Sequence, residues 1–197
     1  MSVVPIIRAS DLLVALIAGL VFVGSFSFNQ YFDGYFVYAP GISLLFIPAG
    51  VKLLAFLVGR IPAVIGLVLA SVYTGFGLWT DVQTPAIYYF ALVSVLSYPI
   101  TASIGMHILG IQRNLDNLRY WHIAALSLAC SVFNGIAHNI VYIWQGVTAT
   151  EELWTKSSAM AFGDFFGCLV VVGIFHTLML VAKQIPNGTA DWRVSVD

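Results

Sequence analysis

The sequence predicts an all-α fold, a polytopic membrane bundle of six transmembrane helices. Of its 197 residues, 60% are hydrophobic and 9% are charged, which leaves too little polar surface for a soluble domain of this size. Apolar runs near the roughly 20 residues that cross about 30 Å of hydrocarbon recur along the chain. These runs lack the alternation of apolar and polar residues that barrel strands show. Their backbone N–H and C=O groups must therefore be paired within helices.

Each expected helix follows from one apolar run, and the short connections predict that sequential helices pack antiparallel. Arg8 precedes the first run, but no cleavage site of small residues follows, so we interpret this run as a retained helix. The expected spans cover residues 10–28, 37–59, 62–79, 85–109, 121–145 and 157–182. They form one transmembrane domain over 1–185, and 186–197 form a short cytoplasmic tail.

Basic residues in the loops predict the orientation of the bundle. Lys156 is the one basic residue on one side, which also carries four carboxylates, Asp33, Asp81, Glu151 and Glu152. The opposite side holds Arg8, Arg60, Arg113, Arg119, Lys183 and Arg193. Because basic loops stay in the cytoplasm, we expect both termini there, in a multi-pass protein of the bacterial inner membrane.

Lys52 is the most informative polar residue, because it lies inside an apolar run four residues after Pro48. A rise of 1.5 Å per residue converts sequence position into depth and places Asp164 and His138 at about the same level. Asn134 should lie one turn deeper, within reach of the Lys52 ammonium. We therefore expect Lys52, Asn134, His138 and Asp164 to form one buried polar cluster.

Two interpretations of this cluster remain open. Ionisable residues within a membrane are functional candidates, so the four side chains could form a ligand, ion or proton site. Alternatively, Lys52 and Asp164 could neutralise each other, directly or through His138 and Asn134, and specify helix pairing. Pro48 and Pro99 predict bent helices, which can line a cavity near the midplane.

Small residues at helical spacing predict close helix packing. Such stripes include Ala15 with Gly19, Gly66 with Ala70, and Gly163 with Gly167. We expect them to pack the bundle internally, with homo-oligomerisation through one stripe as the alternative.

Other classes of function lack their sequence signatures. The net charge of −1 offers no basic patch for nucleic acid. The chain has no phosphate-binding loop, G-x-S-x-G or H-E-x-x-H, so we expect neither an enzyme nor a resident cofactor. His107 and His176 could ligate haem or a metal, but no carboxylate lies nearby, and we interpret them as interface histidines.

Two segments carry a distinctive pattern of small residues in an apolar stretch. The first is FIPAGVKLLAFLVGRIPAVIGLVLAS, where Pro48 and Gly50 open a long apolar helix, and the second is GDFFGCLVVVGIF, with Gly163, Asp164 and Gly167. The two segments resemble the MASE family of bacterial membrane-associated sensor domains. The resemblance implies a sensory bundle that passes a signal to a cytoplasmic output module. Because no kinase or cyclase domain follows Lys183, we expect the output to be a separate membrane or cytoplasmic protein.

The leading hypothesis is therefore a sensor or signal-input protein that lies in the lipid bilayer and binds a small ligand, or senses the membrane, through the polar cluster. The first alternative is a substrate-binding transport subunit, which resembles the six-helix components of energy-coupling-factor vitamin transporters. In that case Ala15 and Gly19 would dock the partner. The second alternative is an accessory subunit of a larger membrane complex.

Overall fold

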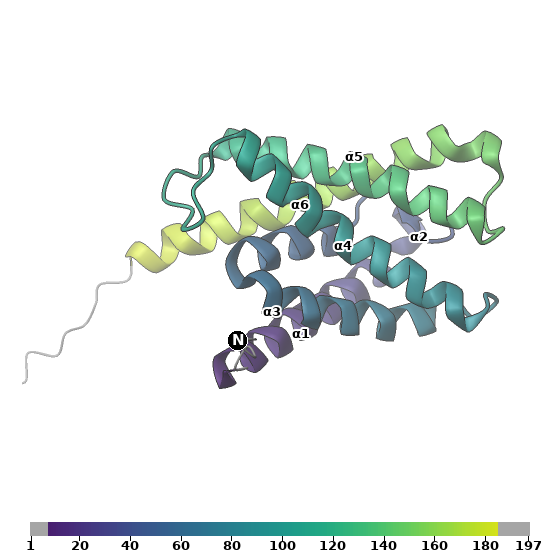
Figure 1. Cartoon of the computed structure of the whole chain (residues 1–197), viewed down its shortest axis with the longest axis horizontal. Helices are drawn as coiled ribbons and strands as arrows, with labels where there is room; N and C mark the ends of the chain where they lie inside the picture. Colours follow the sequence, from purple (N-terminus) through teal and green to yellow (C-terminus); the bar gives the residue numbers. More distant parts are fainter. Residues whose placement is uncertain (1–7, 185–197) are drawn as a thin grey trace, which may run out of the picture.

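The computed structural model describes residues 8–184, which form an elongated helical bundle (Figure 1). Five of its helices are long and apolar enough to cross a membrane. A small hairpin, a short helix and one 3-10 turn complete the described part. The elements are α1 (Ala9–Tyr31), α2 (Asp33–Phe36), β1 (Val37–Ala39), β2 (Ile42–Ser43), α3 (Ile47–Leu78), α4 (Thr84–Ile108), α5 (Tyr120–Trp144), η1 (Thr150–Glu152) and α6 (Leu153–Gln184).

Helix α3 contains a break that divides it into two arms, 47–59 and 61–78. Arg60 has φ 52° and ψ −139°, a backbone conformation that no α-helix contains. The chain reverses there, so that Gly41, shortly before the helix, packs against Trp79, which follows it. Pro62 suits the first turn of the second arm, where its missing N–H costs nothing. The sequence had predicted two spans separated at this point.

The expected helix over 37–59 is wrong in its first ten residues. Residues 37–43 form the antiparallel pair β1 and β2, and the helix begins only at Ile47. Pro40 and Gly41 connect the two strands, and Gly41 has φ 74°, which favours glycine. Aromatic and apolar residues gave this stretch the hydropathy of a membrane span, although the Pro-Gly pair indicates a turn.

The segment that follows β2 lies directly on α6, with its backbone groups paired. Phe46 N–H donates to the Gly163 carbonyl (3.0 Å), and Ile47 N–H donates to Asn29 Oδ1 (3.0 Å). A Cβ on Gly163 would lie 1.8 Å from the Ser43 oxygen, and one on Gly167 would lie 1.9 Å from the Phe46 oxygen. Glycines at these two positions therefore let the backbones touch.

Gly50 extends the same contact into the first arm of α3. A Cβ there would lie 2.7 Å from the Gly167 carbonyl oxygen, and Pro48, at the start of α3, is buried as well. The four positions of the expected motif, Pro48, Gly50, Gly163 and Gly167, thus lie at or beside one crossing of α3 with α6.

The first helix packs along the second arm of α3 (Figure 1). A Cβ on Gly66 would lie 1.9 Å from the Ala15 carbonyl oxygen, and one on Gly19 would lie 3.1 Å from the Gly66 oxygen. The Ala15 and Gly19 stripe thus faces the same chain. Most other α1 side chains, such as Leu12 and Leu16, are exposed, as expected of a helix on the lipid side of a bundle.

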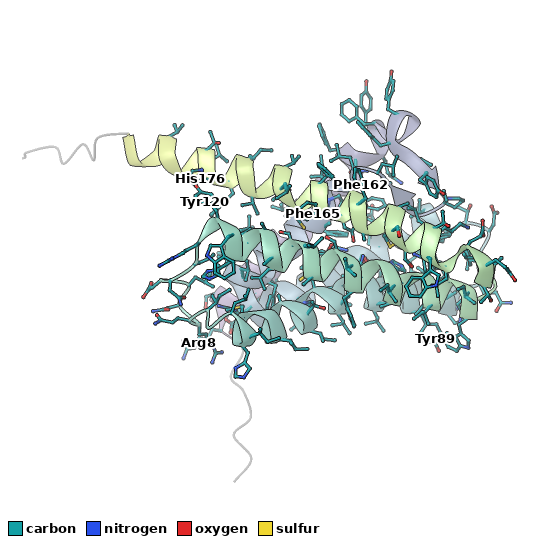
Figure 2. The ribbon with its side chains drawn as sticks, turned by 90° about the horizontal axis from the view of Figure 1, so that it is seen from above. Arg8, Tyr89, Tyr120, Phe162, Phe165 and His176 are labelled. Atoms are coloured by element: carbon teal, nitrogen blue, oxygen red, sulfur yellow. The ribbon has the colours of Figure 1, made fainter. Side chains whose placement is uncertain are left out.

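The C-terminal helix α6 extends beyond the start of α5, the helix that it packs against. Its His176 ring lies edge-on to Tyr120 at the start of α5, with 4.9 Å between ring centroids (Figure 2). The helix then continues through residues 177–184, about 12 Å further at 1.5 Å per residue. The end of α6 consequently projects past the first residue of α5 (Figures 1 and 2).

Candidate functional site

Asp164 on α6 is the centre of a buried hydrogen-bond network. Asp164 is only 2% exposed, and its Oδ2 oxygen accepts both of its hydrogen bonds. Tyr98 donates its hydroxyl proton at 3.0 Å, and Asn134 donates from Nδ2 at 2.6 Å. The Asn134 Oδ1 in turn accepts from Ser97 Oγ at 2.8 Å. Oδ1 of Asp164 accepts no hydrogen bond from the described residues.

Lys52 lies on the other side of Tyr98. Its ammonium is fully buried and donates to the carbonyl (3.0 Å) and hydroxyl (3.1 Å) oxygens of Ser94. It also lies 4.4 Å from the centroid of the Tyr98 ring, a cation–π distance. Within residues 8–184 no ion pair joins Lys52 to Asp164. The Tyr98 side chain therefore links the two opposite charges without direct contact between them.

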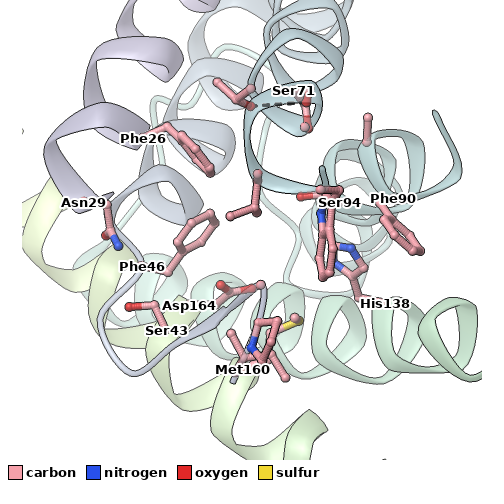
Figure 3. A pocket seen from close by; sticks show the side chains of 18 of the residues that line it. Phe26, Asn29, Ser43, Phe46, Ser71, Phe90, Ser94, His138, Met160 and Asp164 are labelled. Carbon is pink, nitrogen blue, oxygen red and sulfur yellow. Dashed lines mark hydrogen bonds between the residues drawn. The ribbon is translucent and has the colours of Figure 1, made fainter. Parts of the chain in front are cut away.

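A cavity of about 180 Å³ adjoins this network (Figure 3). It lies beneath the hairpin of β1 and β2, between α1, the second arm of α3, and α4 to α6. Asn134, His138 and Asp164 line it, together with Ser94. Aromatic side chains form much of the remaining wall: Phe26, Phe46, Trp79, Phe90 and Tyr142.

His138 faces the cavity without a polar partner. It is 7% exposed, and neither ring nitrogen has a hydrogen-bond partner in the described part of the chain. Its ring packs against Tyr142 at 4.6 Å and Phe90 at 6.2 Å between centroids. Buried polar atoms in folded proteins are nearly always paired, so an unpaired imidazole at a cavity wall indicates a place for a ligand or water.

Helical spacing explains how the sequence brings these groups together. Ser94, Ser97 and Tyr98 occupy positions i, i+3 and i+4 of α4 and so share one face, which meets Asn134 on α5. Asn134 and His138 are four residues apart on α5 and both line the cavity. Asp164 follows Gly163, whose close contact with Ser43 fixes the depth of α6 beside the hairpin.

Three of the four residues expected in the cluster line one cavity. These are Asn134, His138 and Asp164, while the cavity-lining residues of the described chain do not include Lys52. The ammonium was expected to approach Asn134, but it bonds Ser94 instead. Sequence reasoning missed Ser94 and Tyr98, although an S-x-x-S-Y pattern within an apolar run places three polar side chains on one helical face.

The two histidines considered for haem lie elsewhere. His176 packs on Tyr120 and is half-buried, whereas His107 is exposed, and both lie at the end of the bundle away from the cavity. Within residues 8–184, no three His, Cys, Asp or Glu side chains gather in a way that could hold a metal ion.

The fold and the site together define a class: an all-helical chain with five helices long and apolar enough to cross a membrane, and with a cavity lined by polar and aromatic side chains. Comparison with protein-family models, curated proteins and solved structures finds no match for this chain.

Proposed function

We propose that this protein is a sensor-type protein of the bacterial inner membrane that binds a small ligand in the cavity and acts through a separate partner. One observation carries the proposal: Asp164 Oδ1 and both nitrogens of His138 lie unpaired at the wall of the same cavity. A buried polar atom without a partner costs about 1–3 kcal/mol, and both nitrogens of His138 are buried without one in the described chain. A ligand that pairs them recovers this free energy.

The proposed topology has six crossings with both termini in the cytoplasm. The two arms of α3 count as separate crossings, the first completed by the hairpin segment. Arg60 donates to the Arg113 carbonyl, which brings two basic turns together at one end of the bundle. Lys156 pairs with Glu152 (3.0 Å) in the acidic region at the other end. This separation of charge supports a cytoplasmic location for the Arg60 end.

The projecting end of α6 supports action through a partner. Asp164 and the residues past His176 belong to one helix, so a ligand that shifts α6 at the cavity also shifts its far end. Transport is the less favoured alternative, because the Ala15 and Gly19 stripe that would dock an energy-coupling subunit packs on Gly66.

The test is thermal unfolding of the full chain in lipid nanodiscs, with a deproteinised bacterial extract as the probe. A ligand at about 100 times its Kd stabilises the folded state by about 2.7 kcal/mol, which raises the Tm. We expect Asp164→Asn to lose this shift. Ser157→Ala is the matched control, because Ser157 is a buried polar residue on α6 that does not line the cavity. An equal shift in both variants removes the cavity from function.

Purification from the native membrane then distinguishes the two roles. A sensor should copurify with a signalling protein, whereas a transport subunit should copurify with an ATPase module. Mass spectrometry of the purified complex identifies which of the two is present.

A further inference from the structure

We infer that the ligand is an uncharged, single-ring aromatic molecule that carries a hydroxyl group, a member of the phenol class. This inference rests on the proposed function and specifies the chemistry of its ligand. It follows from the unpaired atoms, the charge balance, the size of the cavity and the composition of its wall.

The unpaired carboxylate oxygen requires a donor. Tyr98 and Asn134 both donate to Asp164 Oδ2, which leaves Oδ1 as the acceptor toward the cavity. An ionised carboxylate only accepts hydrogen bonds, so the ligand group that meets it is an O–H or N–H. A neutral imidazole has one donor and one acceptor nitrogen, so the unpaired ring of His138 can bond a second polar substituent.

The charge balance requires a neutral ligand. Lys52 and Asp164 are both buried, on the two sides of Tyr98, and they bear opposite charges when both are ionised. A cationic ligand beside Asp164 would leave the ammonium of Lys52 without its counter-charge inside the bundle. An anionic ligand would meet the carboxylate directly. A hydroxyl group satisfies Asp164 without altering this balance.

The cavity fits one aromatic ring. An engineered apolar cavity of about 150 Å³ in another protein holds benzene, and the present cavity of about 180 Å³ leaves room for one or two hydroxyl groups. Six aromatic side chains line the wall: Phe22, Phe26, Phe46, Trp79, Phe90 and Tyr142. Aromatic rings favour offset-stacked or edge-on contact with another ring.

The experiment is a ¹⁹F NMR titration of the full chain in lipid nanodiscs with four probes of similar size. 4-Fluorophenol is neutral and donates, 4-fluoroanisole is neutral and only accepts, 4-fluorobenzylammonium is cationic, and 4-fluorobenzoate is anionic. We expect 4-fluorophenol to bind tightest, about tenfold or more above 4-fluoroanisole, because of these two neutral probes only the phenol can donate to Asp164. Empty nanodiscs correct for partition into lipid.

Asp164→Asn provides the decisive comparison. The side-chain oxygen of the new amide would accept from Tyr98 and Asn134, so its N–H would face the cavity, and the preference for phenol over anisole should fall to about one. Ser157→Ala should keep the preference, and because a ratio is measured, partial unfolding of a variant does not imitate the result. Tightest binding by either charged probe, or an unchanged ratio in Asp164→Asn, overturns the inference. A bacterial extract that stabilises the protein while no probe binds overturns the ligand class alone, and the proposed function stands.

Discussion

Tyr98 carries out two tasks at once. Its hydroxyl donates to Asp164, and its ring receives the Lys52 ammonium. The remaining Lys52 donors are satisfied by Ser94. A direct buried ion pair would have engaged the carboxylate oxygens of Asp164. In this arrangement Oδ1 has no hydrogen-bond donor in the described chain and can accept one from a ligand in the cavity. Lys52 lies on the far side of the Tyr98 ring from the carboxyl group, where an ammonium compensates a carboxylate charge at Asp164 without direct contact.

Charge compensation across Tyr98 predicts that substitutions of Lys52 and Asp164 are coupled. Lys52→Met should lower the free energy of unfolding by about 3–5 kcal/mol, since it leaves a buried carboxylate without a counter-charge. The double variant Lys52→Met with Asp164→Asn should lose less than the sum of the two single changes. Unfolding by denaturant in mixed micelles measures all three. Losses that add to within about 0.5 kcal/mol would show that the two charges are independent.

At the scale of elements, the crossing of α6 with residues 43–50 sets the depth of the site. Gly163 and Gly167 bring the helix backbone against the backbone of Ser43 and Phe46. The segment before α3 is not helical, and non-helical backbone at membrane depth is tolerated only where protein buries it or where it lines a cavity. Both conditions hold here, since the segment rests on α6 and lines the cavity.

Gly163→Ala tests this crossing. The added methyl would lie 1.8 Å from the Ser43 carbonyl oxygen, so the two backbones must separate. We expect a loss of about 1–3 kcal/mol in the free energy of unfolding, as for other overpacked sites. Gly173→Ala on the same helix is the control, because no heavy atom of the described chain lies within 4 Å of a methyl added there. It should be neutral or stabilise by up to about 1 kcal/mol. Equal losses in the two variants would contradict the close crossing.

The elements show what hydropathy can and cannot predict. Apart from the start of α3, it located the ends of the long helices to within a few residues, because length and apolarity are what a bilayer selects. The expected spans 37–59 and 62–79 also meet at the break in α3, which falls at Arg60. Hydropathy misread residues 37–43, since Val37, Tyr38 and Ile42 score as apolar in a strand as well as in a helix. The Pro40-Gly41 turn was the better guide there.

At the scale of the whole molecule, depth arithmetic predicted part of the site. Asn134 and Asp164 were expected near each other and do form a hydrogen bond of 2.6 Å. Depth alone does not say which way a side chain points around its helix. Lys52 was therefore assigned to the wrong neighbour, and Ser94 and Tyr98 were overlooked. Rotation about each helix follows from packing contacts, such as those of Gly66 and Gly163, which pair residues far apart in the chain.

The six-crossing topology predicts which ends of the bundle are accessible from each side of the membrane. Thr80 and Asn114 are exposed in the connections that precede α4 and follow it. We expect a membrane-impermeant maleimide to label Thr80→Cys in intact cells, and to label Asn114→Cys only after permeabilisation. The native chain is the control, because Cys130 and Cys168 are buried. Labelling of both variants from outside would contradict the topology.

The broken helix α3 also bears on how the chain enters a bilayer during synthesis. Its first arm, residues 47–59, is about 20 Å long, shorter than the roughly 30 Å of hydrocarbon that a stable independent span must cross. It carries Lys52, whose polar partner Ser94 is made later, on α4. In the proposed six-crossing topology, the first arm would therefore partition into lipid together with the second, as one helical hairpin, and Lys52 would gain its partner when α4 is inserted.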